Sequence, residues 1–259
     1  MLEILRAGET NPKRPPLLFV HGAFSGAWIW AEHFLPFFAA AGWECAAVSL
    51  RGHGESSGRD RLDHCGLADY VDDVAEAAAT LGRPPVVIGY SMGGAVAQRF
   101  VTSRASAGLV LLASAPPTGM AGPTWWMTLH RPRFTWQLAV LEAAGAASVD
   151  PEILSQNLFS PETPSAQALR YLPFLQRESR RATMEVMLPQ PVHRPRPGYP
   201  VLVVGGDDDA FIPVAALQAT AAFWQARLTV VPGLPHLAML DARWRRAATA
   251  IADWVADLP

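Results

Sequence analysis

The sequence feature that most constrains the fold is a serine in a glycine-rich turn, between an apolar run and a helical pattern. The run at 86–88 leads into Gly-Tyr-Ser-Met-Gly at 89–93, and small apolar residues follow. Gly89 and Gly93 lack the Cβ atoms that would clash in a sharp strand-to-helix turn. Such a turn lifts the serine oxygen above the sheet, near the free N–H groups at the start of the helix. The pattern predicts a reactive Ser91; a glycine-rich turn with a capping serine is the alternative.

Short apolar runs alternate with longer helical patterns, which is typical of a parallel sheet with helical crossovers. The runs are continuous rather than alternating, as expected of strands that are buried on both faces. They lie at 17–20, 45–48, 86–88, 109–112, 201–204 and 228–231. Helical patterns cover 68–81 and 241–258. We therefore predict an α/β fold with a mostly parallel central sheet that is flanked by helices.

One long segment interrupts this alternation. Between residues 116 and 198 the sequence has no strand-like run, and prolines divide the helical patterns. A length of 259 residues fits one α/β domain with an insertion. We therefore predict a core domain formed by 1–115 and 199–259, with 116–198 as a helical lid inserted between two strands of the sheet.

A serine hydroxyl needs a base that removes its proton and an acid that holds this base in the correct tautomer. His236 is the candidate base, because it follows the last apolar run in a loop marked by glycine and prolines. A solvent-facing loop histidine is the alternative. The candidate acids are Asp207, Asp208 and Asp209, which come just after the run at 201–204.

Five motifs resemble those of the α/β-hydrolase superfamily, in the same order and over nearly the whole chain outside the predicted lid. They are His-Gly-Ala-Phe at 21–24, Arg-Gly-His-Gly-Glu-Ser at 51–56, Gly-Tyr-Ser-Met-Gly-Gly at 89–94, Gly-Gly-Asp-Asp-Asp-Ala-Phe-Ile-Pro at 205–213 and Pro-His at 235–236. The resemblance implies an α/β-hydrolase fold with a triad of Ser91, Asp209 and His236. In this family the acid usually lies four residues before the proline of the acid-loop motif, which selects Asp209 and leaves Asp207 as the second choice.

The resemblance also implies an oxyanion hole. Its two donors would be the main-chain N–H groups of Ala23 and Met92, aimed at the oxygen on which negative charge develops. Other histidines of the matching motifs, His21 and His53, are expected to brace loops rather than to act as bases.

Aromatic residues of the predicted lid are candidates for the substrate pocket. We expect Trp125, Trp126 and Trp136, together with Phe24 of the core, to line an apolar pocket above Ser91. Part of the lid aromatics would serve only to hold the lid against the core.

Charge and residue composition exclude several other functions. Lys+Arg is 21 and Asp+Glu is 23, so the net charge of −2 gives no electrostatic reason to bind nucleic acid. Lys13 is the only lysine and lies in a proline-rich loop, which excludes a P-loop and a Schiff-base lysine. No metal-binding motif of His and Cys occurs, so we expect no metal and no cofactor.

We see neither a signal peptide nor a long apolar run, and expect a cytoplasmic protein without membrane contact. The sequence makes no prediction of the oligomeric state.

The leading hypothesis is a serine hydrolase that cleaves carboxylic esters of small to medium apolar molecules through an acyl-enzyme. Two alternatives keep the same triad: a cofactor-free haloperoxidase (perhydrolase) and a C–C bond hydrolase. The segment 21–28 also resembles hydroxynitrile lyases, but these have a lysine at the position of Leu237. A non-catalytic receptor for a small molecule, built on the same scaffold, is the remote alternative.

Overall fold

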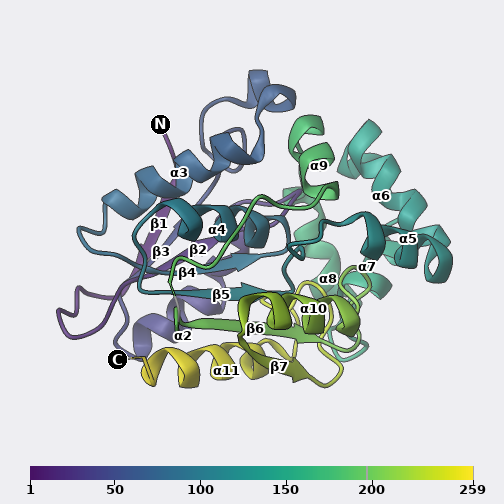
Figure 1. Ribbon diagram of the computed structural model, residues 1–259. Coiled ribbons are helices and arrows are strands. Elements are labelled where there is room, and N and C mark those ends of the chain that lie inside the picture. Colours follow the sequence, from purple (N-terminus) through teal and green to yellow (C-terminus); the bar gives the residue numbers. More distant parts are fainter. Residues whose placement is uncertain (197, 259) are drawn as a thin grey trace.

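A central sheet organises the molecule (Figure 1). The computed structural model describes residues 1–196 and 198–258. Within them, a seven-stranded sheet has the order β1-β3-β2-β4-β5-β6-β7, and only β1 runs antiparallel to its neighbour. The strands are β1 (Ile4–Ala7), β2 (Leu17–Val20), β3 (Cys45–Val48), β4 (Val86–Tyr90), β5 (Gly108–Leu112), β6 (Val201–Gly206) and β7 (Arg227–Val231). The predicted α/β architecture with a mostly parallel sheet is confirmed.

All six apolar runs of the sequence form strands of this sheet. Every residue of β2, β3, β4, β5 and β6 is buried, because protein covers both faces of these strands. The sequence analysis missed β1. This edge strand has only 4 residues and is mostly half-buried, so it contains no continuous apolar run.

Helices cover both faces of the sheet (Figure 1). They are α1 (Trp28–Ala31), α2 (Phe34–Ala40), α3 (Leu67–Ala79), α4 (Met92–Ser103), α10 (Val214–Trp224) and α11 (Trp244–Ala256), with a 3-10 helix η1 at Arg59–His64. α3, α4 and α10 pack on one face, and α1, α2 and α11 on the other. Successive residues of β2 point into opposite cores, because side chains alternate along a strand.

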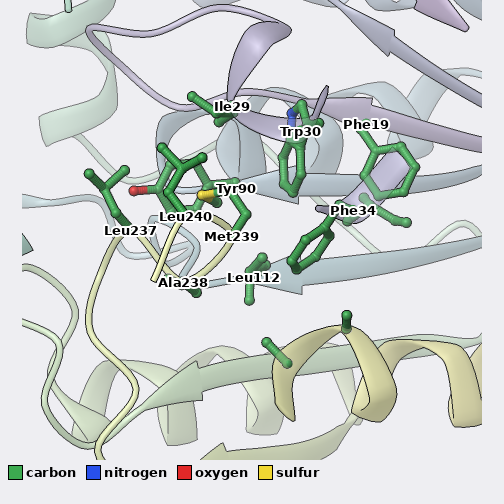
Figure 2. Close-up of a cluster of buried hydrophobic side chains, with 14 of the residues drawn as sticks. Phe19, Ile29, Trp30, Phe34, Tyr90, Leu112, Leu237, Ala238, Met239 and Leu240 are labelled. Carbon is green, nitrogen blue, oxygen red and sulfur yellow. The ribbon is translucent and has the colours of Figure 1, made fainter. Parts of the chain in front are cut away.

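The core under α1, α2 and α11 reaches up to the ends of the strands (Figure 2). Trp30 packs edge-on against Tyr90, with 6.2 Å between ring centroids. Leu237 belongs to the same cluster of buried side chains. Because Tyr90 precedes Ser91 and Leu237 follows His236, this core fixes the backbone on which both predicted catalytic side chains stand.

The chain between β5 and β6, residues 116–198, is termed the inserted segment. Its helices are α5 (Ala121–His130), α6 (Pro132–Ala144), α7 (Pro151–Leu158), α8 (Ser165–Tyr171) and α9 (Arg180–Met187), with 3-10 helices η2 (Ala146–Ser148) and η3 (Leu172–Phe174). These helices lie beyond the carboxyl ends of the parallel strands (Figure 1). Pro132 and Pro151 lie at the first positions of their helices. A main-chain N–H at this position has no acceptor within the helix, so proline, which lacks the N–H, costs no hydrogen bond there. No helix in the described ranges has both the length and the apolar character needed to cross a membrane.

Two buried carboxylates tie the inserted segment to the core. Asp241, just before α11, accepts hydrogen bonds from Ser160 N at 2.8 Å and from Thr163 Oγ1 at 2.7 Å. Glu178, just before α9, lies 3.0 Å from His53 Nε2 and accepts a hydrogen bond from Tyr70 OH at 2.8 Å. Side chains that are far apart in sequence therefore hold the inserted segment in place.

Candidate active site

Ser91 occupies the sharp turn that the glycine pattern predicted. It joins β4 to α4 with φ 52° and ψ −121°, a strained conformation for a residue with a side chain. The turn is possible because its neighbours lack Cβ atoms. A Cβ on Gly89 would lie 2.5 Å from Gly93 O, and one on Gly93 would lie 2.1 Å from His21 O. The serine hydroxyl is thereby held above the carboxyl end of the sheet.

The structure brings the three predicted triad side chains into one hydrogen-bonded series. His236 Nε2 is 3.1 Å from Ser91 Oγ, and His236 Nδ1 is 2.8 Å from Asp209 Oδ2. A carboxylate only accepts, so Nδ1 carries the proton and Nε2 is free to accept one from the serine hydroxyl. His236 and Asp209 are both buried, which limits competition from water.

The three consecutive aspartates of the acid loop have different surroundings. Asp209 Oδ1 accepts hydrogen bonds from the N–H groups of Phe211 at 2.7 Å and Ile212 at 3.0 Å, so its other oxygen is held towards the imidazole. Asp207 accepts from the main chain of Gly233, and Asp208 is exposed. Of the three candidate acids, Asp209 is therefore the one that contacts His236.

The loop after β2 lies directly against the serine. A Cβ on Gly22 would stand 2.9 Å from Ser91 Cβ, so the next residue, Ala23, is held beside the hydroxyl. Met92 is the first residue of α4, and an N–H at this position has no partner within its own helix. Both residues line the same cavity as Ser91. Ala23 and Met92 thus both lie next to Ser91 at this cavity.

His21 braces this loop with both ring nitrogens. Nδ1 donates to Gly22 O at 2.8 Å, and Nε2 accepts from Leu50 N at 3.0 Å. Complete burial, with a smaller contribution from the charge of His53, lowers the pKa of His21 to about 3. His21 is therefore neutral and fully used in hydrogen bonds, in agreement with the bracing role expected from the sequence.

The lowered pKa of His21 makes stability depend on pH. Below pH 6.5 the imidazole of His21 binds a proton in the unfolded chain but not in the folded chain. The free energy of unfolding therefore decreases as the pH is lowered from 6.5 to about 3. At up to ~1.4 kcal/mol per pH unit, the loss between pH 6.5 and 4.5 should be about 2 kcal/mol. Urea unfolding at a series of pH values measures it. In His21→Gln the loss between pH 6.5 and 4.5 should be smaller by this amount, whereas exposed His64→Gln should keep it; an unchanged loss in His21→Gln would contradict this assignment.

A cavity of about 370 Å³ lies over Ser91, between the core and the inserted segment. Phe24 lines it, as expected from the sequence. Most of the remaining lining comes from α5, α6, α9 and the acid loop, and includes Met120, Met127, Leu138, Met184, Met187 and Phe211. The lining is predominantly apolar, so the site favours an apolar ligand next to a polar reacting centre.

The expected role of the lid tryptophans is wrong. Trp125 and Trp136 are 67% and 68% exposed, and Trp126 stacks on His130 with 4.8 Å between ring centroids. None of the three lines the cavity in the described residues. The turns of α5 and α6 direct Thr124, Met127 and Leu138 inward instead, so adjacent tryptophans point away.

Comparison with known proteins identifies the class to which this fold and site belong. Residues 17–250 match the model of the alpha/beta hydrolase family, and the chain belongs to that family. Family membership, together with the geometry above, supports hydrolase activity.

Three individual proteins to which the chain is similar share 33% or less of their aligned residues with it. The chain is 28% identical over 249 residues to a non-heme haloperoxidase of Rhodococcus erythropolis, covering 85% of each protein. It is 33% identical over 104 residues to protein phosphatase methylesterase 1 of Bos taurus, a match that spans 39% of this chain and only 27% of that protein. Among solved structures, a bromoperoxidase from Bacillus anthracis superposes with a TM-score of 0.77 at 17% identity, covering 99% and 95% of the two chains. The structural likeness concerns the fold.

Proposed function

We propose that this protein is a serine hydrolase that cleaves carboxylic esters through an acyl-enzyme intermediate. The observation that carries the proposal is the hydrogen-bonded series from Asp209 through His236 to Ser91, with distances of 2.8 and 3.1 Å. A serine in such a series has a base ready to take its proton, and this base is held in the productive tautomer.

The first half of the reaction forms the acyl-enzyme. Ser91 Oγ attacks the ester carbonyl carbon while His236 Nε2 takes the hydroxyl proton. The carbonyl oxygen becomes an oxyanion, and the N–H groups of Ala23 and Met92 stabilise it. When the tetrahedral intermediate collapses, the bond to the alcohol oxygen breaks and this oxygen takes the proton from Nε2. Asp209 stabilises the imidazolium throughout.

The second half releases the acid. Water replaces the alcohol, gives a proton to His236 and attacks the acyl carbon. The second tetrahedral intermediate collapses with return of the proton to Ser91 Oγ, which restores the free enzyme. The same oxyanion donors serve both halves, because the same oxygen becomes charged in each.

The inserted segment would act as the lid of this site and determine which esters enter. α5, α6 and α9 contribute much of the cavity lining, and the cavity volume is about 370 Å³. A space of this size with an apolar lining fits small to medium apolar acyl or alcohol groups.

Labelling with a fluorophosphonate, followed by turnover of p-nitrophenyl esters of graded chain length, tests the proposal. We expect stoichiometric modification of Ser91 and a steep decline in kcat/KM from medium to long acyl chains, because long chains exceed the cavity. A protein that neither reacts with the phosphonate nor cleaves any ester of the series would contradict the proposed function.

Perhydrolysis is a second candidate, favoured by the similarity to the haloperoxidase of Rhodococcus erythropolis. In this reaction hydrogen peroxide takes the place of water at the acyl-enzyme, so the products are a peracid and the free serine. Incubation with acetate and peroxide, followed by titration of peracetic acid, measures it. Peracid formation faster than ester hydrolysis would favour perhydrolysis as the main activity.

A further inference from the structure

The imidazole of His236 contacts an aromatic ring as well as the two other side chains of the triad. The ring of Phe211 stacks on it, with 4.3 Å between ring centroids and 28° between ring planes. Phe211 follows Asp209 by two residues in the acid loop, and its N–H donates to Asp209 Oδ1 at 2.7 Å. One residue therefore contacts the acid of the triad through its main chain and the base through its side chain.

This stacking restricts a movement of the imidazole that its hydrogen bonds control poorly. The bonds of His236 to Asp209 and Ser91, at 2.8 and 3.1 Å, are made by the two ring nitrogens. Hydrogen bonds to a planar ring are best formed near its plane, so they resist a tilt of the ring only weakly. Phe211 fills the space on one side of that plane and opposes a tilt towards it, which keeps Nε2 directed at Ser91 Oγ.

The stacked ring also suits the charge that His236 acquires during the proposed reaction. The face of an aromatic ring carries partial negative charge and attracts a cation placed above it. His236 becomes an imidazolium each time it takes a proton, from Ser91 in the first half and from water in the second. Phe211 is half-buried, so water weakens this attraction less than it would at an exposed ring.

A second aromatic contact connects Phe211 to the inserted segment. Phe134 of α6 is buried and meets the ring of Phe211 edge to face, with 5.0 Å between centroids and 86° between planes. Edge-to-face packing is a favourable arrangement of two aromatic rings. The rings of Phe134, Phe211 and His236 thus form a continuous series from the inserted segment to the base of the triad.

We propose that Phe211 is a positioning residue for this reaction, which holds the imidazole of His236 in line with Ser91 and stabilises the imidazolium. Phe134 keeps Phe211 in that position. The inserted segment then contributes to the chemical step, in addition to forming much of the cavity wall. This inference rests on the proposed esterase function, because it concerns the base of that reaction.

Hydrolysis of p-nitrophenyl acetate by Phe211→Leu tests this role. Leucine keeps an apolar side chain but has no ring, so we expect kcat to fall about 5- to 10-fold. Phe211→Tyr keeps the ring and should retain most of the wild-type kcat. Phe223→Leu, at an exposed phenylalanine of α10, is the matched control and should leave kcat unchanged. An unchanged kcat in Phe211→Leu would overturn the proposal.

The contribution of the inserted segment is measured with Phe134→Leu. This variant should lower kcat in the same direction but less, by about 2- to 3-fold, because the ring that supports Phe211 is lost while Phe211 remains. An unchanged kcat would overturn the role of Phe134.

Phe211 also lines the cavity, so contact with the substrate has to be separated from contact with the base. A positioning role predicts the same fold-loss of kcat in Phe211→Leu for the acetyl and the hexanoyl ester, with KM nearly unchanged. A loss confined to the longer ester, or found only in KM, would show that Phe211 acts as a wall of the cavity and would overturn the proposal.

A double-mutant cycle determines whether Phe211 acts through His236. In the His236→Ala background, adding Phe211→Leu should cause no further loss of the residual ester cleavage, because no imidazole remains to be positioned. A further loss as large as that in the wild-type background would overturn the proposal. NMR spectra give an independent signature: the ring protons of His236 should move downfield in Phe211→Leu, since the stacked ring no longer shields them, and should stay in place in Phe211→Tyr.

Phosphonate labelling separates failure of this inference from failure of the fold or of the proposed function. Phe211→Leu should still reach complete labelling of Ser91, only more slowly, which shows that the variant is folded. A wild-type protein that neither reacts with the phosphonate nor cleaves the esters would contradict the esterase function itself. An active wild-type protein whose kcat, labelling rate and His236 ring-proton shifts are unchanged in Phe211→Leu would overturn the positioning role alone.

Discussion

Replacing Ser91 with alanine is expected to lower kcat/KM for p-nitrophenyl ester hydrolysis by about 10⁴-fold or more. The reason is that no other group stands where Ser91 Oγ does, 3.1 Å from the imidazole nitrogen that must take the proton. The oxyanion donors and the cavity remain intact in this variant, so substrate binding and a small residual rate should persist. Initial rates over a range of ester concentrations give kcat/KM, and phosphonate labelling should be lost in parallel.

Matched substitutions show whether the loss is specific. Ser103→Ala removes an exposed serine at the other end of the same helix and should leave kcat/KM unchanged. Asp209→Asn should lower kcat by about 10³- to 10⁴-fold, because the amide favours the wrong imidazole tautomer. Asp207→Asn should have a small effect, since Asp207 contacts the main chain of Gly233 rather than His236. Near-full activity in Ser91→Ala would exclude the acyl-enzyme mechanism.

The sheet could be predicted from the sequence because burial on two faces leaves a clear pattern. The strands β2 to β6 are buried throughout, and each appears in the sequence as an unbroken apolar run. β1 could not be found in this way, because an edge strand of 4 residues needs no apolar face. The turn at Ser91 could also be predicted, because two nearby residues of the same segment determine it. Only glycine fits at 89 and 93, since a Cβ at these positions would lie 2.5 and 2.1 Å from backbone atoms.

The wall of the cavity could not be predicted, because it depends on how each inserted helix is rotated about its axis. Trp125 and Thr124 are adjacent on α5, yet the threonine faces the cavity and the tryptophan faces solvent. Large aromatic side chains suggested a pocket by their size alone. The spacing of Thr135 and Leu138 did place them on one side of a helix, but a sequence pattern does not show which side faces inward.

The contact between Glu178 and His53 was likewise invisible in the sequence, since 125 residues separate them. In the folded chain both side chains are fully buried and lie 3.0 Å apart. Burial, the largest single influence, would lower the pKa of His53, but the charge of Glu178 and the hydrogen bonds to Glu178 and to the main chain of Arg51 together outweigh it and raise the pKa. Burial is likewise the largest single influence on Glu178 and opposes its ionisation, but the charge of His53 and the hydrogen bonds from His53, Ser179 N and Tyr70 together lower its pKa. The two groups therefore form an ion pair between the core and the inserted segment.

Glu178→Leu is expected to lower the free energy of unfolding by about 3–5 kcal/mol, because it leaves a buried imidazolium and the hydroxyl of Tyr70 without their acceptor. Urea unfolding at pH 5.5 measures the loss. The contribution of Glu178 is complete above pH 4.5 and is lost as pH falls through its lowered pKa. That of His53 is complete below pH 6.5 and is lost as pH rises through its raised pKa. The difference between wild type and variant should therefore be largest between these two values.

A double substitution separates loss of the ion pair from loss of packing. His53→Leu combined with Glu178→Leu removes both charges, so it should be less destabilised than the sum of the two single variants. Glu76→Leu, at an exposed glutamate of α3, is the control and should change the free energy of unfolding by less than about 0.5 kcal/mol.

The inserted segment carries much of the cavity wall, so Glu178→Leu should also raise KM for ester cleavage while Ser91 remains reactive to phosphonate. Additive single and double variants would show that the two side chains are not coupled, and that the inserted segment is held by its remaining contacts, including those of Asp241.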